Sequence, residues 1–392
     1  RKPSLPGPRS VKPNLRLERL KWINDYKGVS VLPLLAPKKP KETEVPWHIS
    51  MREREGKDQN EILSQEICSF HDYIRPSPLE TVARKTTVKR VKNSVRAVLP
   101  DMDLEVFGSE RTGLAFALSD LDLRLVADDE QTATGLPSRN VRNRLNGHLK
   151  TLERELRKQT TSYSLVAHRH ARYPLVAMQH RSTGLDVQIV LSNDTAQSRD
   201  YMNRSMKEFP YLSQLYSVVK TMFDMRGLSD VFRGGFGSYS IFMMIVASLR
   251  HSPSIPSDVG QALLHFLEFW ERFDTTSKGI SIEPAELYDK ASTQVISRTA
   301  KIKLEENKTQ PPNFMLSLRD PADPTNDLGR KGFCIKHVQA TCAFLLLDLR
   351  QRLEKQHTES FLASIVACIY PLQLASRRRL EAIGLTVERS RL

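Results

Sequence analysis

Cysteine is scarce in this sequence, and long apolar runs are missing. The four cysteines are Cys68, Cys334, Cys342 and Cys368, and none belongs to a Cys-x-x-Cys pair or to a cysteine–histidine pattern. We therefore expect reduced thiols in an intracellular protein, without a disulfide framework or structural zinc. No stretch of about 18 apolar residues occurs, so no membrane-spanning helix is expected. The sequence also has no internal repeat, which excludes a solenoid or a propeller.

The composition is that of a basic globular protein. The chain has 392 residues, enough for two domains with proper cores, and apolar residues make up 40% of it. Lysine and arginine exceed aspartate and glutamate by 14, and the sequence pI is near 9.6. Such a charge favours association with a polyanion such as nucleic acid, although it specifies no site. A basic protein without such a partner is the alternative.

Residues 1–57 are expected to form a basic, proline-rich arm. Prolines recur from Pro3 to Pro46, and basic residues outnumber acidic ones up to Lys41. Such a segment cannot bury enough apolar surface to order itself alone, apart from one amphipathic helix expected over Leu15–Tyr26. The first residue is arginine, so we expect an upstream segment such as a cleaved basic presequence; a trimmed chain is the alternative. The arm is a candidate for binding RNA or a protein partner.

Apolar periodicity predicts mostly helices. Spacing bounded by proline, glycine or capping residues predicts helices over 60–73, 77–98, 140–158, 211–226, 238–249, 261–273, 332–354 and 359–374. The helix over 77–98 is expected to expose a basic face that includes Arg84. Alternating or continuous apolar residues predict strands within 161–180 and 181–191. Residues 276–312 are expected to be irregular, and the basic end, 376–392, to be a solvated tail.

The most informative stretch is Leu104–Val126, with the sequence LEVFGSERTGLAFALSDLDLRLV. In its second half three leucines, at 121, 123 and 125, alternate with Asp120, Asp122 and Arg124, which predicts a strand with one buried face. The two carboxylates then lie side by side, where they repel unless a cation lies between them. Mg²⁺ takes carboxylate and phosphate oxygens as ligands. The alternative is a solvated acidic strand edge. Arg124 is expected to pair with a carboxylate.

Gly108 and Ser109 precede this strand in a polar turn. A glycine there lets the backbone approach a ligand, and N–H groups with a serine hydroxyl suit a phosphate. The order strand, Gly-Ser, short helix, Ser-Asp-x-Asp strand resembles the signature of the nucleotidyltransferase superfamily typified by DNA polymerase β. Within it, FGSERTGLAFALSDLDL resembles the non-canonical poly(A) and poly(U) polymerases. Residues 65–100 are similar to the run that enters the same strand in that family.

The resemblance implies a third carboxylate, Asp186. It follows a strand that begins with Arg172-Tyr173-Pro174-Leu175, similar to the corresponding family strand. Leu185, Val187 and Ile189 alternate with Asp186 and Gln188, so Asp186 is expected on the polar face. Taken alone, an aspartate in a strand is a solvated face residue.

The block VVKTMFDMRGLSDVFRGGFGSYS resembles the central-domain motif of the same family. By position, the resemblance implies that Lys220 meets the triphosphate, that Ser238 bonds a phosphate oxygen and that Tyr239 stacks on the base. Two positions depart from the family pattern. Asp224 stands where some members have a second lysine, and Ser229 stands where asparagine is usual.

Residues 315–330, MLSLRDPADPTNDLGR, resemble the nucleotide-recognition loop of the family. Asp320, Asp323 and Asn326 occupy its informative positions. Uridine-adding members often carry histidine at the last of these positions, and adenosine-adding members often carry asparagine or another small residue. Asn326 therefore implies ATP as the preferred substrate. Without the resemblance, this is a common proline- and aspartate-rich loop.

The resemblance extends over about Asn60–Leu374 and implies an α+β protein of two domains. A palm-like nucleotidyltransferase domain with a mixed sheet, 84–200, is inserted into a helical central (PAP-associated) domain, 58–83 and 201–375, and the active site is expected in the cleft between them. Asp120, Asp122 and Asp186 would hold two divalent ions, Mg²⁺ or Mn²⁺. The implied reaction is in-line attack of an RNA 3′-hydroxyl on the α-phosphorus of ATP.

Other functions stay open. A polymerase-derived subunit of a larger RNA–protein complex, weakly active or inactive, is favoured by the basic arm and by Asp224 and Ser229. A terminal uridylyltransferase, or a relative that acts on a small molecule or a tRNA end, are further alternatives. The sequence contains no RNA-recognition domain or zinc knuckle, so RNA binding is expected to depend on phosphate contacts by basic residues. The expected compartment is the mitochondrion or the nucleus, with the mitochondrion favoured.

Overall fold

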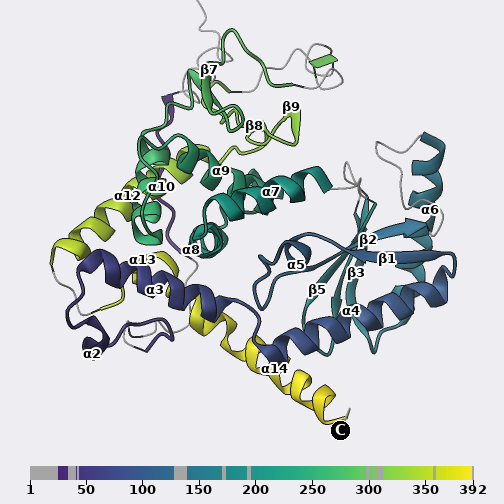
Figure 1. Cartoon of the computed structure of the whole chain (residues 1–392). Helices are drawn as coiled ribbons and strands as arrows, with labels where there is room; N and C mark the ends of the chain where they lie inside the picture. Colours follow the sequence, from purple (N-terminus) through teal and green to yellow (C-terminus); the bar gives the residue numbers. More distant parts are fainter. Residues whose placement is uncertain are drawn as a thin grey trace, which may run out of the picture. The chain divides into compact units, whose positions relative to one another are not determined.

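The structure is a computed structural model that describes residues 25–33, 41, 44–127, 139–169, 174–191, 196–296, 301–302, 306, 312–355 and 359–390. The chain divides into two compact units (Figure 1). The first, here called the sheet unit, comprises Pro33–Arg226, Ser254–Leu264 and Asp348–Leu392. The second, here called the hairpin unit, comprises Arg1–Leu32, Gly227–Pro253 and His265–Leu347. The domain limits predicted from the sequence stay a prediction.

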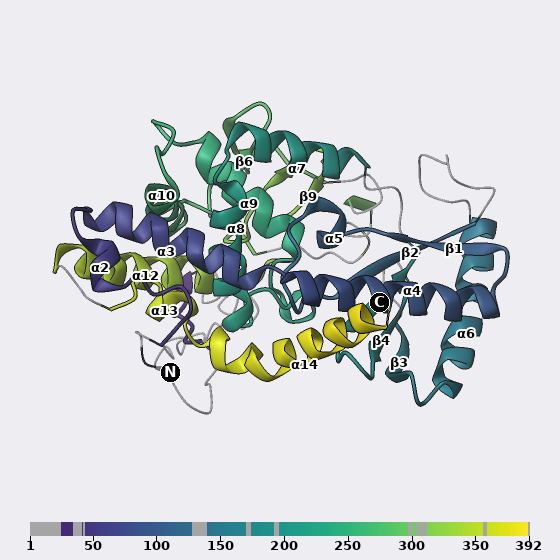
Figure 2. The same ribbon diagram turned by 60° about the horizontal axis from the view of Figure 1, so that its bottom comes forward.

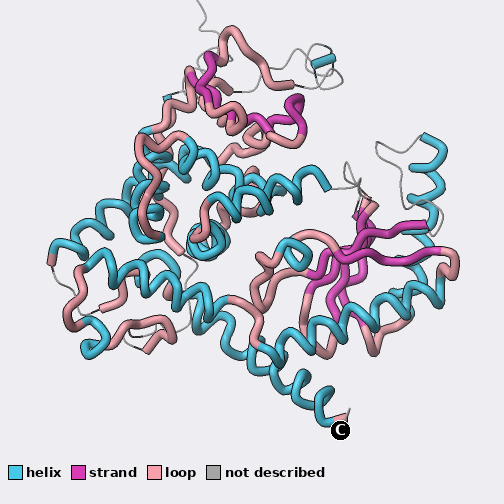
Figure 3. The backbone as a smooth tube through the Cα atoms, in the orientation of Figure 1, coloured by secondary structure: helices cyan, strands magenta, loops and turns pink. Residues whose placement is uncertain are grey.

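The sheet unit contains a five-stranded mixed sheet, shown in magenta in Figure 3. Its strands are β1 (Met102–Val106), β2 (Leu121–Ala127), β3 (Tyr163–Arg169), β4 (Leu175–His180) and β5 (Asp186–Val190). The spatial order is β1-β2-β5-β4-β3, in which β2 and β5 run parallel and the other neighbours run antiparallel. The predicted α+β class with a mixed sheet is confirmed.

Nine described helices lie wholly within the sheet unit, and they include the helices predicted before and after the sheet strands. They are α2 (Met51–Arg54), α3 (Gln59–Ile74), α4 (Pro78–Val98), α5 (Ser109–Thr112), α6 (Arg139–Lys158), α7 (Ala196–Glu208), α8 (Leu212–Met225), α13 (Ala363–Val366) and α14 (Ile369–Arg389). Helix α4 begins where its sequence predicts, because Ser77 and Glu80 form a capping box and Pro78 follows the cap.

One face of the sheet packs against α4 and α6. The three alternating leucines of β2, at 121, 123 and 125, are at most 4% exposed, which confirms the predicted buried face. They share a core with three leucines of α6 and with apolar residues of α4: Leu149, Leu152, Leu156, Ala83, Val91 and Val95. Burying each leucine stabilises the fold by about 1.5–3 kcal/mol. This core fixes which face of β2 is left for polar side chains.

The expected basic tail is instead helix α14, which lies along α4 (Figures 1 and 2). Arg377 donates to both carboxylate oxygens of the fully buried Glu80, at 2.9 and 2.8 Å, and its guanidinium lies over the ring of Tyr73. The expectation of a solvated segment is therefore wrong for 376–390. The prediction relied on the basic composition of the segment, which cannot show that a carboxylate remote in sequence holds the helix in place.

The predicted arm is also ordered in its last part. Trp47 is fully buried against the rings of Phe70, Tyr73 and Tyr370, and Val45 and Ile49 are buried beside it. The helix predicted over Leu15–Tyr26 lies outside the described residues except for its last two positions. The residues Arg172-Tyr173 that carry part of the resemblance also lie outside them.

The hairpin unit contains the 3-10 turn η1 (Val231–Arg233), helix α9 (Ser238–Arg250) and the adjoining parts of α10 (Val259–Arg272) and α12 (Ile335–Glu354). Two antiparallel hairpins complete it: β6 (Lys278–Ser281) with β7 (Glu286–Asp289), and β8 (Arg319–Asp320) with β9 (Asp323–Asp327). The first hairpin corrects the prediction of an irregular 276–312. Its strands have four residues each, too few for a periodic signal, although Ile280 is fully buried. Within the described residues, no helix is long and apolar enough to cross a membrane.

Candidate active site

Three predicted carboxylates meet at one end of the paired strands β2 and β5. Leu121 pairs with Val187 in this parallel pair, so Asp120 and Asp186 each stand immediately before a paired residue on neighbouring strands. Asp122 lies two residues after Asp120 and alternates with the buried leucines, so it projects from the sheet face opposite the core. The structure thus brings Asp120, Asp122 and Asp186 together within the sheet unit.

Asp120 and Asp122 are partly withdrawn from water, whereas Asp186 is exposed. Burial raises the pKa of Asp120, and the negative charge of Asp186 raises it further. Burial, and then the charge of Asp120, raise the pKa of Asp122 to about 7. The amide of Gln188 donates to Asp120 Oδ2 at 2.7 Å, which acts in the opposite direction. Gln188 shares the polar face of β5 with Asp186; the sequence placed it there but gave it no role.

This donor set fits divalent cations. Two desolvated carboxylates that repel each other favour a positive ion between them, and hard divalent ions take carboxylate oxygens. Among the described residues, no group of three or more histidine, cysteine, aspartate or glutamate side chains is placed so that it could hold a metal ion, so the fit rests on the pair Asp120 and Asp122. Asp186 Oδ1 accepts from the amide of Gln179 at 3.2 Å.

Gly108 and Ser109 lie against this group. Gly108 has φ +65°, and a Cβ atom there would stand 2.4 Å from Asp122 Oδ2. Only glycine lets the backbone take this conformation so close to the carboxylate. Ser109 is the first residue of the four-residue helix α5. The predicted turn and the predicted carboxylates are therefore neighbours, and the close approach is to Asp122.

Arg84 organises the loop around the site. Its side chain is 2% exposed, pairs with Glu110 of α5, and donates from Nη1 to the carbonyl oxygens of Ala117 and Ser119 at 2.9 and 2.8 Å. Its positive charge also lowers the pKa of both Asp120 and Asp122. The prediction that Arg84 belongs to an exposed basic face is wrong. It belongs to the buried face of α4, a fact that depends on partners outside the helix.

Lys220 is on α8 in the same unit. Its positive charge lowers the pKa of Asp120, which places it within electrostatic reach of the site. Its ammonium donates to both carboxylate oxygens of Asp224, with 2.6 Å to Oδ2. Asp224, which departs from the family pattern, thus binds Lys220, the lysine that the resemblance places at the triphosphate.

The recognition-loop residues gather in the hairpin unit around Asp320. The hydroxyl of Tyr239 donates to Asp320 Oδ1 at 2.8 Å, and the amide nitrogen of Asn326 donates to Asp320 Oδ2 at 2.9 Å. Ser238 is the first residue of α9, next to Tyr239. Asp323 instead accepts from the backbone and hydroxyl of Thr325, so it shapes its own turn. The sequence did not indicate Asp327, whose carboxylate accepts from the amides of Leu318 and Gly329 and from the Ser317 hydroxyl, and so fixes the loop.

The mixed five-stranded sheet carries Asp122 on β2 and Asp186 on β5, with Asp120 immediately before β2 and the Gly-Ser turn ahead of them, which is the arrangement that the resemblance to the nucleotidyltransferases implies. Residues 63–202 match the family model described as poly(A) RNA polymerase, mitochondrial-like, central palm domain. The match covers all five strands of the sheet and the three carboxylates. The resemblance to the non-canonical poly(A) polymerases predicted from the sequence is confirmed.

Two curated relatives illustrate the similarity. Poly(A) RNA polymerase cid14 of Schizosaccharomyces pombe is 30% identical over 308 residues, which are 76% of this chain and 42% of that protein. A Drosophila melanogaster protein named inactive non-canonical poly(A) RNA polymerase protein Trf4-2 is 28% identical over 290 residues, 71% of this chain and 65% of that one. The chain spans about half the length of the curated relatives it matches.

Solved structures share the fold. The polymerase core of TRAMP, an RNA surveillance complex, has a TM-score of 0.66 and 23% identity, with 82% of this chain and 99% of that chain covered. The crystal structure of mtPAP in complex with UTP has a TM-score of 0.59 and 16% identity, with 85% and 78% covered. The similarity to these nucleotide-polymerising proteins supports the α+β fold described above.

Proposed function

We propose that this protein is an RNA 3′-terminal nucleotidyltransferase that works without a template and adds AMP from ATP, a poly(A) polymerase. One observation carries the proposal. Asp120, in the desolvated pair Asp120 and Asp122, stands level with Asp186 on the neighbouring strand, and Gly108 lies against Asp122. The family match over residues 63–202 and a relative named as a poly(A) RNA polymerase support it.

Asp120, Asp122 and Asp186 would hold Mg²⁺ or Mn²⁺. When bound, such ions supply charge neutralisation for the phosphates and lower the pKa of the attacking 3′-hydroxyl. The protein contributes the preorganised carboxylates. Arg84 fixes the surrounding loop through Glu110, and Gly108 lets that loop lie against Asp122. The raised pKa of Asp122 means that a cation would take the place of a proton at neutral pH.

The triphosphate would be bound by Ser109, Lys220 and Ser238. Ser109 directly follows Gly108, whose backbone lies against Asp122, and its hydroxyl would donate to a phosphate oxygen. Lys220 supplies a positive charge once its ammonium leaves Asp224. Ser238 opens α9, where a hydroxyl and the first helical N–H groups suit an anion.

The base would be read by Tyr239 and Asn326. Asp320 holds both side chains, so the ring and the amide keep fixed orientations. One N–H of the Asn326 amide bonds Asp320, and the amide oxygen remains as an acceptor to which the N6 amino group of adenine can donate. Asparagine is also smaller than the histidine that uridine-adding members of the family often carry, so it leaves room for a purine. That room favours ATP over UTP.

Extension of an oligo(A) RNA tests the proposal. We expect the unmodified protein to lengthen the RNA with ATP and Mg²⁺ or Mn²⁺. Asp122→Asn should lower the rate by about 1,000-fold or more, since it removes charge from the site. Asp101→Asn, an exposed turn residue, is the matched control and should keep the normal rate. Near-normal extension by Asp122→Asn would overturn the metal assignment.

A polymerase-derived subunit with little or no catalysis is the second candidate. The Lys220–Asp224 ion pair favours it, and so does the relative whose name calls it inactive. Under this alternative, no NTP is incorporated at any metal concentration although RNA is bound.

We also propose that the basic N-terminal segment binds a protein or RNA partner. The proposed compartment is intracellular, and the mitochondrion is favoured over the nucleus. Imaging of the tagged full-length protein tests the compartment.

A further inference from the structure

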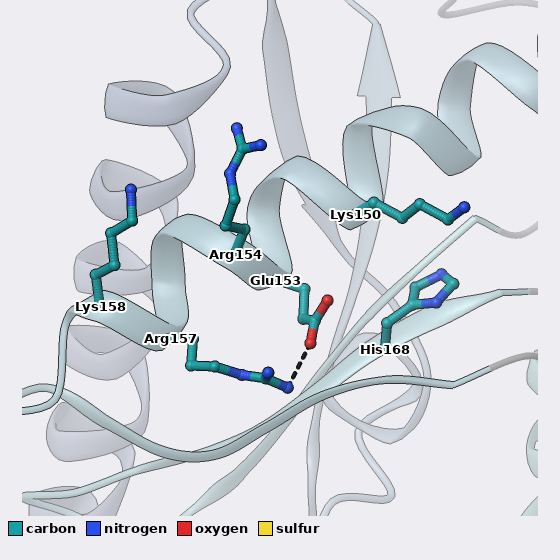
Figure 4. Close-up of a pocket in the computed structure, with 6 residues that line it drawn as sticks. All are labelled: Lys150, Glu153, Arg154, Arg157, Lys158 and His168. Atoms are coloured by element: carbon teal, nitrogen blue, oxygen red, sulfur yellow. Dashed lines mark hydrogen bonds and ion pairs between the residues drawn. The ribbon is translucent and has the colours of Figure 1, made fainter.

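A basic groove lies on the palm away from the carboxylates. Its volume is about 760 Å³, and it lies between α6 and the edge strand β3 (Figure 4). It is lined by Lys150, Glu153, Arg154, Arg157, Lys158 and His168. We call it the α6 groove. No part of the site described above contributes to it.

The groove carries an excess of positive charge at the surface. Four of its lining residues are lysine or arginine and one is acidic. The side chains of Arg154, Arg157 and Lys158 are 68%, 64% and 65% exposed. Glu155 is shared between Arg154 and Lys158, so one carboxylate faces two cations. Exposed ion pairs of this kind contribute little to stability, so an arriving anion can compete for these cations at small cost.

The excess is concentrated in one helix. The sequence of α6 holds seven lysines or arginines and two glutamates, a net charge of +5 in 20 residues of a chain whose total is +14. Lys150, Arg154 and Lys158 are each four residues apart. They therefore follow one helix face at intervals of about 6 Å, from a rise of about 1.5 Å per residue. A row of cations matches an extended polyanion better than a compact one.

The sheet separates this groove from the carboxylates. Leu149, Leu152 and Leu156 of α6 pack in the core with Leu121 and Leu123 of β2. Asp122, which alternates with those leucines, projects from the opposite face of the sheet. A ligand in the α6 groove is therefore not the nucleotide at the catalytic carboxylates. It is either a separate molecule or a distant part of a long substrate.

The strand that borders the groove has an unusual backbone. β3 is an edge strand with a register shift between Ser164 and Ala167, and Leu165 within it has φ +53° and is 77% exposed. Arg157 donates to the carbonyl oxygen of the next residue, Val166, at 3.1 Å. Strained and bulged backbone at a sheet edge is often retained for function. Here the exposed Leu165 stands next to Val166, the residue whose carbonyl oxygen Arg157 bonds.

We propose that the α6 groove binds the phosphate backbone of single-stranded RNA upstream of the 3′ end. The proposal rests on RNA being the substrate, as proposed above. The α6 cations bond successive phosphates. Long RNA is held at both the groove and the catalytic carboxylates, whereas a short primer reaches only the carboxylates. An acidic polypeptide is the competing occupant.

The test measures binding of labelled A20 and A5 RNA to the full chain, without metal or nucleotide. The groove variant is Lys150→Gln/Arg154→Gln/Lys158→Gln. The matched control, Lys85→Gln/Lys89→Gln/Arg96→Gln, removes the same charge from exposed positions of α4. We expect the groove variant alone to lose A20 affinity. The slope of log affinity against log salt should shrink by about 2, the effect of three lost contacts to a single strand. Extension of A5 should be unchanged.

Variants that exchange lysine and arginine, and so keep the charge, control for misfolding. Lys150→Arg/Arg154→Lys/Lys158→Arg should keep A20 affinity, and the melting temperatures of all variants should agree. Equal losses in the groove variant and the α4 control would overturn the proposal, because binding would then follow net charge alone. Competition by polyglutamate as effective as by RNA of equal charge would overturn it in favour of an acidic polypeptide. Failure of extension alone would reject the polymerase function and leave the groove assignment standing.

Discussion

The ammonium of Lys220 is bound by both carboxylate oxygens of Asp224, one turn further along α8. The lysine side chain is 15% exposed and the aspartate 35%, so the pair is partly withdrawn from water. Under the proposed function, Lys220 cannot serve a triphosphate fully while Asp224 holds it. We therefore expect the pair to limit how tightly nucleotide binds.

Asp224→Asn should release the lysine and strengthen nucleotide binding. Because the pair is partly exposed, we expect the KM for ATP to fall about 3- to 10-fold, equivalent to about 0.6–1.4 kcal/mol. Lys220→Met should raise the KM instead. Steady-state extension kinetics over a range of ATP concentrations measure both. An unchanged KM in Asp224→Asn would show that the pair does not restrain the nucleotide site.

Gly108→Ala should damage activity more than stability. The new Cβ would meet Asp122 Oδ2 at 2.4 Å, so the carboxylate must shift. Gly113→Ala is a matched control, because Gly113 also has positive φ, +74°, but a Cβ there meets nothing within 4 Å. Gly113→Ala should cost about 1–2 kcal/mol of stability for its left-handed backbone. Gly108→Ala should cost about 1–3 kcal/mol, because φ +65° with ψ −145° is a conformation almost confined to glycine. Only Gly108→Ala should lower extension by an order of magnitude or more. Equal activities for the two variants would contradict the described contact.

Arg377→Ala should destabilise the fold. It leaves the fully buried carboxylate of Glu80 without its guanidinium partner, which costs about 3–5 kcal/mol. Arg378→Ala, at the exposed neighbouring position of α14, should change the free energy of unfolding by no more than about 0.5 kcal/mol. Urea denaturation followed by circular dichroism compares them. Similar free energies of unfolding for the two variants would show that α14 is not held to the fold by the Arg377–Glu80 pair.

Stability should depend on pH through Glu66. This buried carboxylate accepts from the Ser360 hydroxyl and from the amides of Phe361 and Leu362, and burial raises its pKa to about 7, against an ordinary value of 4.5. The folded state therefore binds the proton more tightly than the unfolded state. The stability it contributes is complete below about pH 4.5 and is lost as the pH rises to about 7.

Glu66→Gln removes this dependence. The free energy of unfolding of the unmodified protein, minus that of the variant, should fall by an amount on the order of 2 kcal/mol between pH 5 and 8. Glu55→Gln, at an exposed position, should leave the difference flat. Urea denaturation at a series of pH values measures the free energy of unfolding of each protein. A difference that rises with pH would mean that the carboxylate is ionised in the folded protein.

Local signals accounted for what could be predicted. The alternation of leucine and aspartate in β2 placed the carboxylates opposite the core, and the Ser77–Glu80 capping box located the start of α4. The expectation that Arg124 pairs with a carboxylate is also confirmed, since it binds Glu105 across the β1–β2 pair. Each of these depends on residues close in sequence or on adjacent strands.

Partners remote in sequence account for what was missed. Arg84 looks like one of several exposed basic residues of α4, yet carbonyl oxygens more than 30 residues away bury it. Arg377 finds Glu80 across 297 residues, and Trp47 is covered by Tyr370. Composition describes such segments as basic or proline-rich. It cannot show which carboxylate or ring will lie against them.

The most direct test of the account is a competition between nucleotides. The unmodified protein is given an oligo(A) RNA with equal ATP and UTP, and the added tails are sequenced. We expect adenosine tails, because Asn326 offers an acceptor to the adenine amino group. Asn326→His, which fills purine space and cannot keep the same bond to Asp320, should shift the preference towards UTP by about 1–3 kcal/mol. Uridine tails from the unmodified protein, or no tails at all, would contradict the account.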